Sequence, residues 1–362
     1  MEPDRTDVPN AGTSTTGAWA TGAWLAAASA VGPWRLLPGV LVAVVVAIAS
    51  TVIAAVETRL VGHPVIEALV VALLLGMVVR FGWRPGTTFD PGIRFAGKGL
   101  LELSVAILGL SVDLPLLVRA GAALGLAIVA IVAVGLVAGV AVARALGLNR
   151  RLAVLVATGN AICGNSAIAA VAPVIGADAE DVASSIAFTA ILGVIVVLGL
   201  PLLIDALGLT HYQYGVLAGL TVYAVPQVLA AAFPVSALSG EVATLVKLVR
   251  VLMLGPVVLF FALRERSRVV RTLSLGTLVP WFIVGFLALA AVRAADIVPP
   301  GWIAPTRLVS TYLTIVAMAA LGLSADVRMV ARAGSRVVAA VSLSLLILVA
   351  LGIAIIHLLG IR

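Results

Sequence analysis

Apolar stretches of about twenty residues alternate with short polar segments along most of the chain. A helix needs roughly 20 apolar residues to cross the hydrocarbon core of a bilayer. We therefore predict an all-α polytopic membrane protein with about eleven transmembrane helices. The predicted spans are residues 37–56, 63–82, 92–114, 121–145, 152–176, 182–206, 213–235, 241–263, 276–295, 305–325 and 335–359.

Residues 1–36 come before the first span and differ from it in character. They are polar at first and then Ala-rich, and they lack the basic region that opens a signal peptide. We expect a disordered cytoplasmic tail there, followed by a single membrane domain over residues 37–362.

The composition agrees with this class, since 62% of the residues are hydrophobic and 11% are charged. A soluble domain has about 25% charged residues. The net charge of +7 lies in short loops, which suits membrane orientation and argues against nucleic-acid binding. No histidine is near Cys163 in sequence, and His63, His211 and His357 form no metal-binding pair. We expect no catalytic residue, no metal and no cofactor, and hence no enzyme.

The cations divide unequally between the two sets of alternating loops. One set holds fourteen: Arg80, Arg84, Arg94, Lys98, Arg144, Arg150, Arg151, Arg264, Arg266, Arg268, Arg271, Arg328, Arg332 and Arg336. The other holds five, Arg59, Arg119, Arg293, Arg307 and Arg362, together with the acidic turn 178–181. The positive-inside rule puts the first set on the cytoplasmic side of the membrane, with the N-terminus inside and the C-terminus outside.

A short motif occurs twice, as Leu108-Gly-Leu-Ser-Val-Asp-Leu114 and as Leu321-Gly-Leu-Ser-Ala-Asp-Val327. An odd number of spans separates the copies, so they face opposite sides of the membrane. This indicates an inverted-topology repeat with motifs at 97–128 and 310–341. Chance similarity in a Leu/Ala/Gly-rich chain is the alternative.

Glycines and asparagines interrupt the apolar segment 152–176 between Thr158 and Ser166. A helix break survives in a membrane only where it is buried in protein or lines a cavity, and transporters put substrate sites at such breaks. A half-helix that starts at Gly164-Asn165-Ser166 would offer free N–H groups to an anion, with Asn160 close by. Tight packing of small residues is the alternative reading.

A second interruption lies in the segment 213–235, where Pro226 removes a helix hydrogen bond. Tyr223 and Gln227 bring polar groups to the same depth. We predict a second discontinuous helix that lines the substrate site, with an ordinary proline kink as the alternative.

Lys247 and Arg250 share one face of the predicted span 241–263, and Arg250 lies roughly 14 Å deep at 1.5 Å per residue. Cations at that depth are costly and should face a cavity or a partner, so we predict that they attract an anion. The alternatives are pairing with Glu102, or Lys247 reaching out to the interface. Glu102 is itself a candidate for a coupling proton or cation.

The run Ala161-Ile-Cys-Gly-Asn-Ser-Ala-Ile-Ala-Ala170, followed by Gln227-Val-Leu-Ala-Ala231 and Val246-Lys-Leu-Val-Arg-Val251, resembles the YeiH-like family, which carries the label of sulfate exporters. The resemblance runs from about residue 60 to the C-terminus. It implies a relation to sodium/proton antiporters and bile-acid symporters, with crossed discontinuous helices and a core that moves against a scaffold.

Two places in the chain depart from the family pattern. Tyr223 and Ala224 stand where many members carry His-Glu, and Glu102 stands where many carry a basic residue. Both changes alter the charge of the core, so the substrate and the coupling ion stay open.

Together these features predict a secondary transporter of a small anion, such as sulfate, another sulfur oxyanion or a sulfonate. The expected binding residues are Asn160, Gly164, Asn165, Ser166, Tyr223, Gln227, Lys247 and Arg250. The expected partners are the anion, a coupling proton or sodium ion, the lipid bilayer and, as a further candidate, a second copy of the chain. The alternatives are a monovalent cation/proton exchanger of the same fold and a non-transporting membrane subunit.

Overall fold

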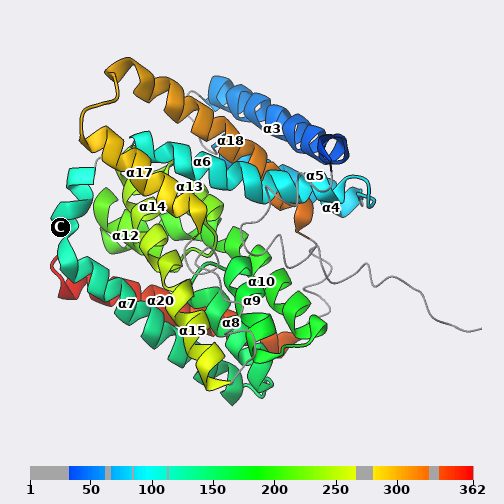
Figure 1. Ribbon diagram of the computed structural model, residues 1–362, viewed down its shortest axis with the longest axis vertical. Coiled ribbons are helices and arrows are strands. Elements are labelled where there is room, and N and C mark those ends of the chain that lie inside the picture. Colours follow the sequence, from blue (N-terminus) through cyan, green and yellow to red (C-terminus); the bar gives the residue numbers. More distant parts are fainter. Residues whose placement is uncertain are drawn as a thin grey trace, which may run out of the picture.

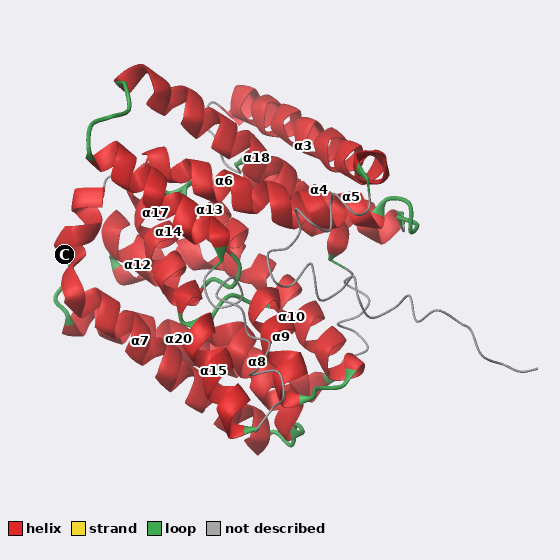
Figure 2. Ribbon diagram, viewed as in Figure 1, coloured by secondary structure: helices red, strands yellow, loops and turns green. Residues whose placement is uncertain are grey.

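The computed structural model describes residues 32–61, 67–83, 85–111, 114–265, 280–325 and 334–361, and the regular secondary structure in these ranges is helical (Figure 2). Most of the predicted N-terminal tail and the second repeat copy beyond Ala325 lie outside the described residues. Five helices are long and apolar enough to cross a membrane: Trp34–Leu60, Ala123–Ala145, Ala237–Arg264, Ile303–Ser324 and Ser335–Leu358. The prediction of an all-α polytopic membrane protein is confirmed.

The order of the elements follows the predicted spans closely. They are α3 (Pro33–Val61), α4 (Ala68–Gly82), α5 (Asp90–Phe95), a π-helical turn (Ala96–Leu100), α6 (Leu101–Leu108), a 3-10 turn (Gly109–Ser111), α7 (Leu114–Ala145), α8 (Arg150–Ala161), α9 (Asn165–Ile175), α10 (Ala179–Gly199), a 3-10 turn (Leu200–Leu202), α11 (Leu203–Leu207), α12 (His211–Thr221), α13 (Val225–Ala232), α14 (Ala237–Leu252), α15 (Leu254–Arg264), α17 (Trp281–Ala294), a 3-10 turn (Pro300–Trp302), α18 (Ile303–Ser324) and α20 (Ser335–Leu358). α5, the π-helical turn and α6 follow without a break, and we call them the α5–α6 rod.

The helices pack as two groups. The small bundle consists of α3, α4, the α5–α6 rod, α17 and α18, and the large bundle consists of α7 to α15 and α20. In Figure 1 the small bundle fills the upper part of the view, and most of the large bundle lies below it.

Glycines let the helices of the small bundle approach closely. A Cβ added at Gly92 of α5 would lie 2.0 Å from the backbone oxygen of Leu36 and 2.7 Å from the Cα of Gly39, both in α3. A Cβ at Gly322 of α18 would lie 2.3 Å from the oxygen of Leu73 in α4. Such backbone contacts are how small residues hold helices together in a membrane.

The α6–α18 contact bears on the predicted repeat, because each of these helices leads into one copy of the motif. Ser104 Oγ donates to the oxygen of Ser310 at 2.8 Å, and a Cβ at Gly97 would lie 3.6 Å from Ala320. The residue numbers therefore rise along α6 while they fall along α18. The two helices are antiparallel neighbours.

The segment from α8 to α9 folds back on itself. Arg151, at the start of α8, forms an ion pair with Asp178, just beyond α9, at 3.4 Å. Asn149 Nδ2 donates to Asp181 at 3.1 Å. The end of α9 therefore lies beside the start of α8, and we call residues 150–175 hairpin 1.

The segment from α12 to α13 reverses in the same way. Tyr214, near the start of α12, donates its hydroxyl to the oxygen of Ala231 at the end of α13, at 2.7 Å. Ser239 of α14 donates to the oxygen of His211 at 2.8 Å, so α14 starts where α12 starts. We call residues 211–232 hairpin 2.

The two hairpins enter from opposite ends of α20. A Cβ at Gly147, just before hairpin 1, would lie 3.4 Å from Nη1 of Arg336, at the start of α20. Gln213 of hairpin 2 donates to the oxygen of Ile361, beyond the end of α20, at 2.6 Å. Since α20 is long enough to cross a membrane, the hairpins start at opposite faces of the membrane and point toward each other.

The hairpins correct two predictions. Segments 152–176 and 213–235 do not cross from one face to the other, and the acidic turn 178–181 lies on the same face as Arg151. The reason is that an apolar run of about 24 residues has the length of one crossing or of two half-crossings. In hairpin 1 the reversal occurs at Gly164, whose φ of +69° is a conformation that side chains disfavour.

The close helix crossing gives a stability prediction. We expect Gly92→Ala to lower the melting temperature of the purified protein by several degrees, because the added carbon forces α3 and α5 apart. Gly125→Ala in α7 is the matched control, since nothing lies within 4 Å of its Cβ position. Equal melting temperatures for the two variants would contradict the close packing.

The hairpin topology predicts a labelling pattern. In a Cys163→Ser background, Ala145→Cys and Glu180→Cys should react with an impermeant maleimide from one face, and Leu359→Cys from the other. Modification of positions 145 and 180 from opposite faces would mean that residues 152–176 cross the membrane.

Candidate functional site

The tips of the two hairpins meet inside the large bundle. Tip 1 is Ile162–Gly164 and tip 2 is Val222–Ala224. A Cβ at Gly164 would lie 3.4 Å from the Cβ of Tyr223, so the two tips are in contact. Both interrupted helices of the sequence analysis therefore contribute to one place.

Lys247 and Arg250 of α14 join the two tips, and both side chains are fully buried. Lys247 Nζ donates to the oxygen of Ile162 at 2.5 Å and to that of Val222 at 2.9 Å. Arg250 Nε donates to the oxygen of Ala161 at 2.6 Å. Its Nη2 donates to the oxygen of Asn160, and its Nη1 to those of Val222 at 3.2 Å and Gly219 at 3.4 Å.

These carbonyl groups belong to the last turns of α8 and α12. A helix leaves its last carbonyls without intrahelical donors, and its C-terminal end carries a partial negative charge. The two cations satisfy both ends at once. Among the described residues, the ion pairs are Arg150–Glu265, Arg151–Asp178 and Arg307–Glu241, and none reaches Lys247 or Arg250. Within the described part of the chain, backbone dipoles are the groups that oppose these two positive charges.

The start of α9 lies at the same meeting point. The Asn165 side chain is half-buried and accepts a hydrogen bond from Thr189 of α10 at 2.5 Å, whereas Ser166 is exposed. The residues of tip 1 are buried. The first N–H groups of a helix have no intrahelical acceptor, so this helix start can receive an anion.

Gln227, Asn160 and Tyr223, the other predicted site residues, differ in whether their polar atoms are hydrogen-bonded. Gln227 caps α13, because its Oε1 accepts from the N–H of Ala224 at 3.2 Å. Asn160 donates its Nδ2 to the oxygen of Val341 at 3.1 Å. Its Oδ1 and the hydroxyl of Tyr223 are buried without a hydrogen-bond partner, which is unusual enough to suggest a ligand or water.

Glu102 does not lie beside Lys247 and Arg250 of the large bundle, as one of the alternatives required. It lies in α6 of the small bundle and accepts a hydrogen bond from Trp281 Nε1 at 2.6 Å. The alternative that pairs Glu102 with Lys247 or Arg250 is absent from the ion pairs of the described residues.

Lys98 was not among the predicted site residues, because it was counted with the cytoplasmic cations although it lies inside the predicted span 92–114. Lys98 lies in the π-helical turn of the α5–α6 rod, eight residues after the rod begins at Asp90. It interacts electrostatically with Glu102 and lies within electrostatic range of Cys163 in tip 1. The spacing of four residues to Glu102 was the available signal.

A family model described as Conserved hypothetical protein 698 matches residues 38–341. The chain belongs to this family. The match covers both hairpins and α14, so the site described above lies within the matched region.

The similar proteins are bacterial membrane proteins of the same kind. A UPF0324 membrane protein of Bradyrhizobium diazoefficiens is 51% identical over 89% of this chain and 93% of its own. One of Brucella suis is 53% identical over 90% and 98%. The UPF0324 membrane protein TauZ of Paracoccus pantotrophus is 35% identical over 86% and 94%. No solved structure matches.

The capping contacts predict a stability effect at Lys247. We expect Lys247→Met to lower the free energy of unfolding by about 1–3 kcal/mol. The buried carbonyl of Ile162 loses the Lys247 donor, whereas that of Val222 keeps its hydrogen bond from Arg250 Nη1. Arg264→Met, at an exposed position of α15, should leave the melting temperature unchanged. Comparable unfolding curves for both variants would refute the capping role.

Proposed function

We propose that the protein is a secondary transporter of a small anion, of the class of sulfate, other sulfur oxyanions and sulfonates, and not an enzyme. The observation that carries this proposal is the pair of buried cations at the meeting point of the hairpin tips, opposed only by backbone dipoles among the described residues. A buried charge of this kind favours a ligand of opposite sign.

The architecture supports transport over simple binding. Discontinuous helices that meet near the bilayer midplane are a common way to build a transporter site. The two faces of the membrane are each connected to the site by one hairpin. Movement of the large bundle against the small bundle would expose the site to each face in turn.

We propose that the two opposed hairpins are equivalent elements of the inverted repeat, as α6 and α18 are. The segments that cross are then α3, α4, the α5–α6 rod, α7, α10 with α11, α14 with α15, α17, α18 and α20. The cation-rich loops keep one common face in this topology, so the N-terminus remains cytoplasmic and the C-terminus outside. We also propose a second copy of the chain as a partner.

A test must separate charge from capping, because Arg250→Ala would remove both. Arg250→Gln and Lys247→Gln retain donors for the carbonyl groups and remove the charge. We expect these variants to bind sulfate or methanesulfonate at least tenfold more weakly, measured as ligand-dependent thermal stabilisation and as flux in proteoliposomes. Arg264→Gln serves as the control, and wild-type flux in both site variants would overturn the proposal.

The rival function is a monovalent cation/proton exchanger that uses Glu102, which is a buried carboxylate. Flux driven by a sodium or pH gradient without any anion would support this rival. Absence of any flux, together with a stable membrane partner, would support a non-transporting subunit.

A further inference from the structure

A third cation approaches tip 1 from the other bundle. Lys98 of the small bundle and Lys247 and Arg250 of the large bundle all lie within electrostatic range of the thiol of Cys163. Lys98 is half-buried, whereas the other two are fully buried.

The depth of Lys98 matches that of tip 1. The α5–α6 rod ends where α7 begins, and α7 ends where α8 begins, so the rod and α8 start at the same face. Lys98 lies eight residues, or about 12 Å, from the start of its rod, and tip 1 follows twelve residues, or about 18 Å, of α8. The flexible four-carbon stem of lysine covers a difference of about 6 Å.

The backbone around Lys98 is built in an unusual way. It lies in the π-helical turn Ala96–Leu100, between Gly97 and Gly99, while ordinary α-helix continues on both sides. A Cβ at Gly97 would lie 3.6 Å from Ala320, so α18 supports this turn from behind. Single π-turns inside α-helices occur frequently at functional sites.

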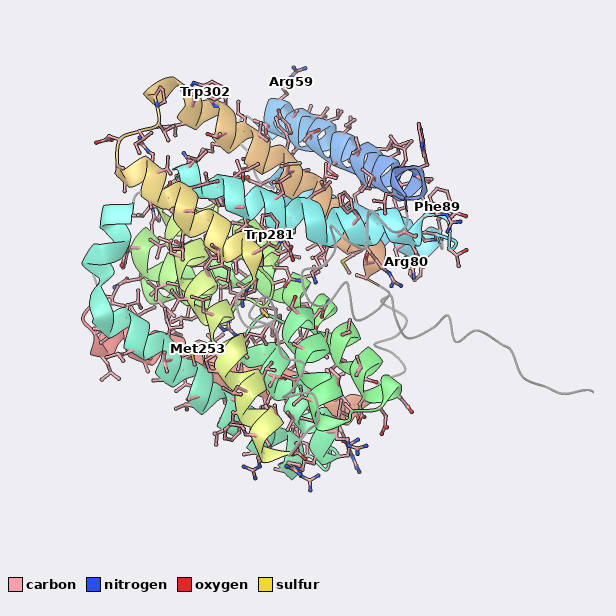
Figure 3. The ribbon with its side chains drawn as sticks, in the orientation of Figure 1. Arg59, Arg80, Phe89, Met253, Trp281 and Trp302 are labelled. Atoms are coloured by element: carbon pink, nitrogen blue, oxygen red, sulfur yellow. The ribbon has the colours of Figure 1, made fainter. Side chains whose placement is uncertain are left out.

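Glu102 stands one turn after Lys98 and interacts with its charge. Trp281, labelled in Figure 3, lies at the start of α17. Its indole holds the Glu102 carboxylate through the 2.6 Å hydrogen bond. The carboxylate is therefore oriented by a rigid neighbour, and the longer, flexible lysine is the member of the pair that can move.

We propose that Lys98 binds the transported oxyanion from the small bundle, opposite the start of α9, and that Glu102 holds Lys98 while the site is empty. This inference rests on the proposed anion transport. A bound oxyanion would compete with Glu102 for the ammonium group. The substrate would then touch both bundles, and its release would depend on Lys98 returning to Glu102.

The proposal predicts effects of opposite sign for two neighbouring residues. Sulfate affinity, measured by calorimetry and thermal stabilisation of the full-length purified protein, should fall at least tenfold in Lys98→Gln and rise in Glu102→Gln. Lys98→Arg should bind much as the wild type does. Arg94→Gln, an exposed position one turn earlier, is the matched control and should not change the affinity.

The possible results separate the two proposals. Wild-type protein that binds sulfate, with unchanged affinity in both Lys98→Gln and Glu102→Gln, would overturn the role of Lys98 and leave anion transport standing. A purely structural ion pair predicts this outcome together with lower melting temperatures in both variants. Wild-type protein that binds neither sulfate nor methanesulfonate would overturn both proposals. If Lys98→Gln fails to fold, the affinity of Glu102→Gln decides, since equal or weaker binding contradicts the competition.

Discussion

A helix that ends inside a membrane leaves carbonyl groups that neither water nor a further turn can satisfy. In the described ranges of the chain, α8 and α12 end in this way, and the fold brings the two ends together. Lys247 and Arg250 of α14 donate to both ends, through the oxygens of Ile162, Ala161 and Val222 among others. The burial of both hairpins depends on this arrangement, because their end carbonyls would otherwise lack donors at this depth.

The same arrangement explains why two cations can lie in the protein interior. Desolvation of a cation is costly, and burial normally requires a partner of opposite charge. Here the partners are dipoles, which lower the cost without cancelling the charge. The cations therefore cap the helix ends and also give the site a positive charge. A substitution at Lys247 or Arg250 changes both the stability of the fold and the charge of the site.

The sequence predicts the helices well and the connectivity of their ends less well. Apolar length identifies nearly every helix, and the glycines, asparagines and proline inside two apolar segments identify the breaks near Gly164 and Pro226. It does not distinguish a crossing helix from a hairpin, because that difference depends on contacts such as Arg151–Asp178 that join residues 27 positions apart.

The candidate site shows the same limit at the level of side chains. Residue type and depth predict that Lys247 and Arg250 need partners, but backbone carbonyls have no signature in sequence. Likewise, the capping role of Gln227 and the hydrogen bond between Trp281 and Glu102 depend on how the chain folds. Lys98 lies near the start of the predicted span 92–114 and was counted with the cytoplasmic cations, whereas the helical rod already begins at Asp90 and places it deeper.

The lengths of three helices determine where the site lies. α8 has 12 residues and α12 has 11, so they extend about 18 Å and 17 Å along their axes. α20 has 24 residues and extends about 36 Å. The two half-helices laid end to end therefore match a single crossing helix. Because the hairpins start at opposite ends of α20, its length sets the distance between their starting points. The half-helices α8 and α12 are long enough to bring the tips into contact and too short to pass each other.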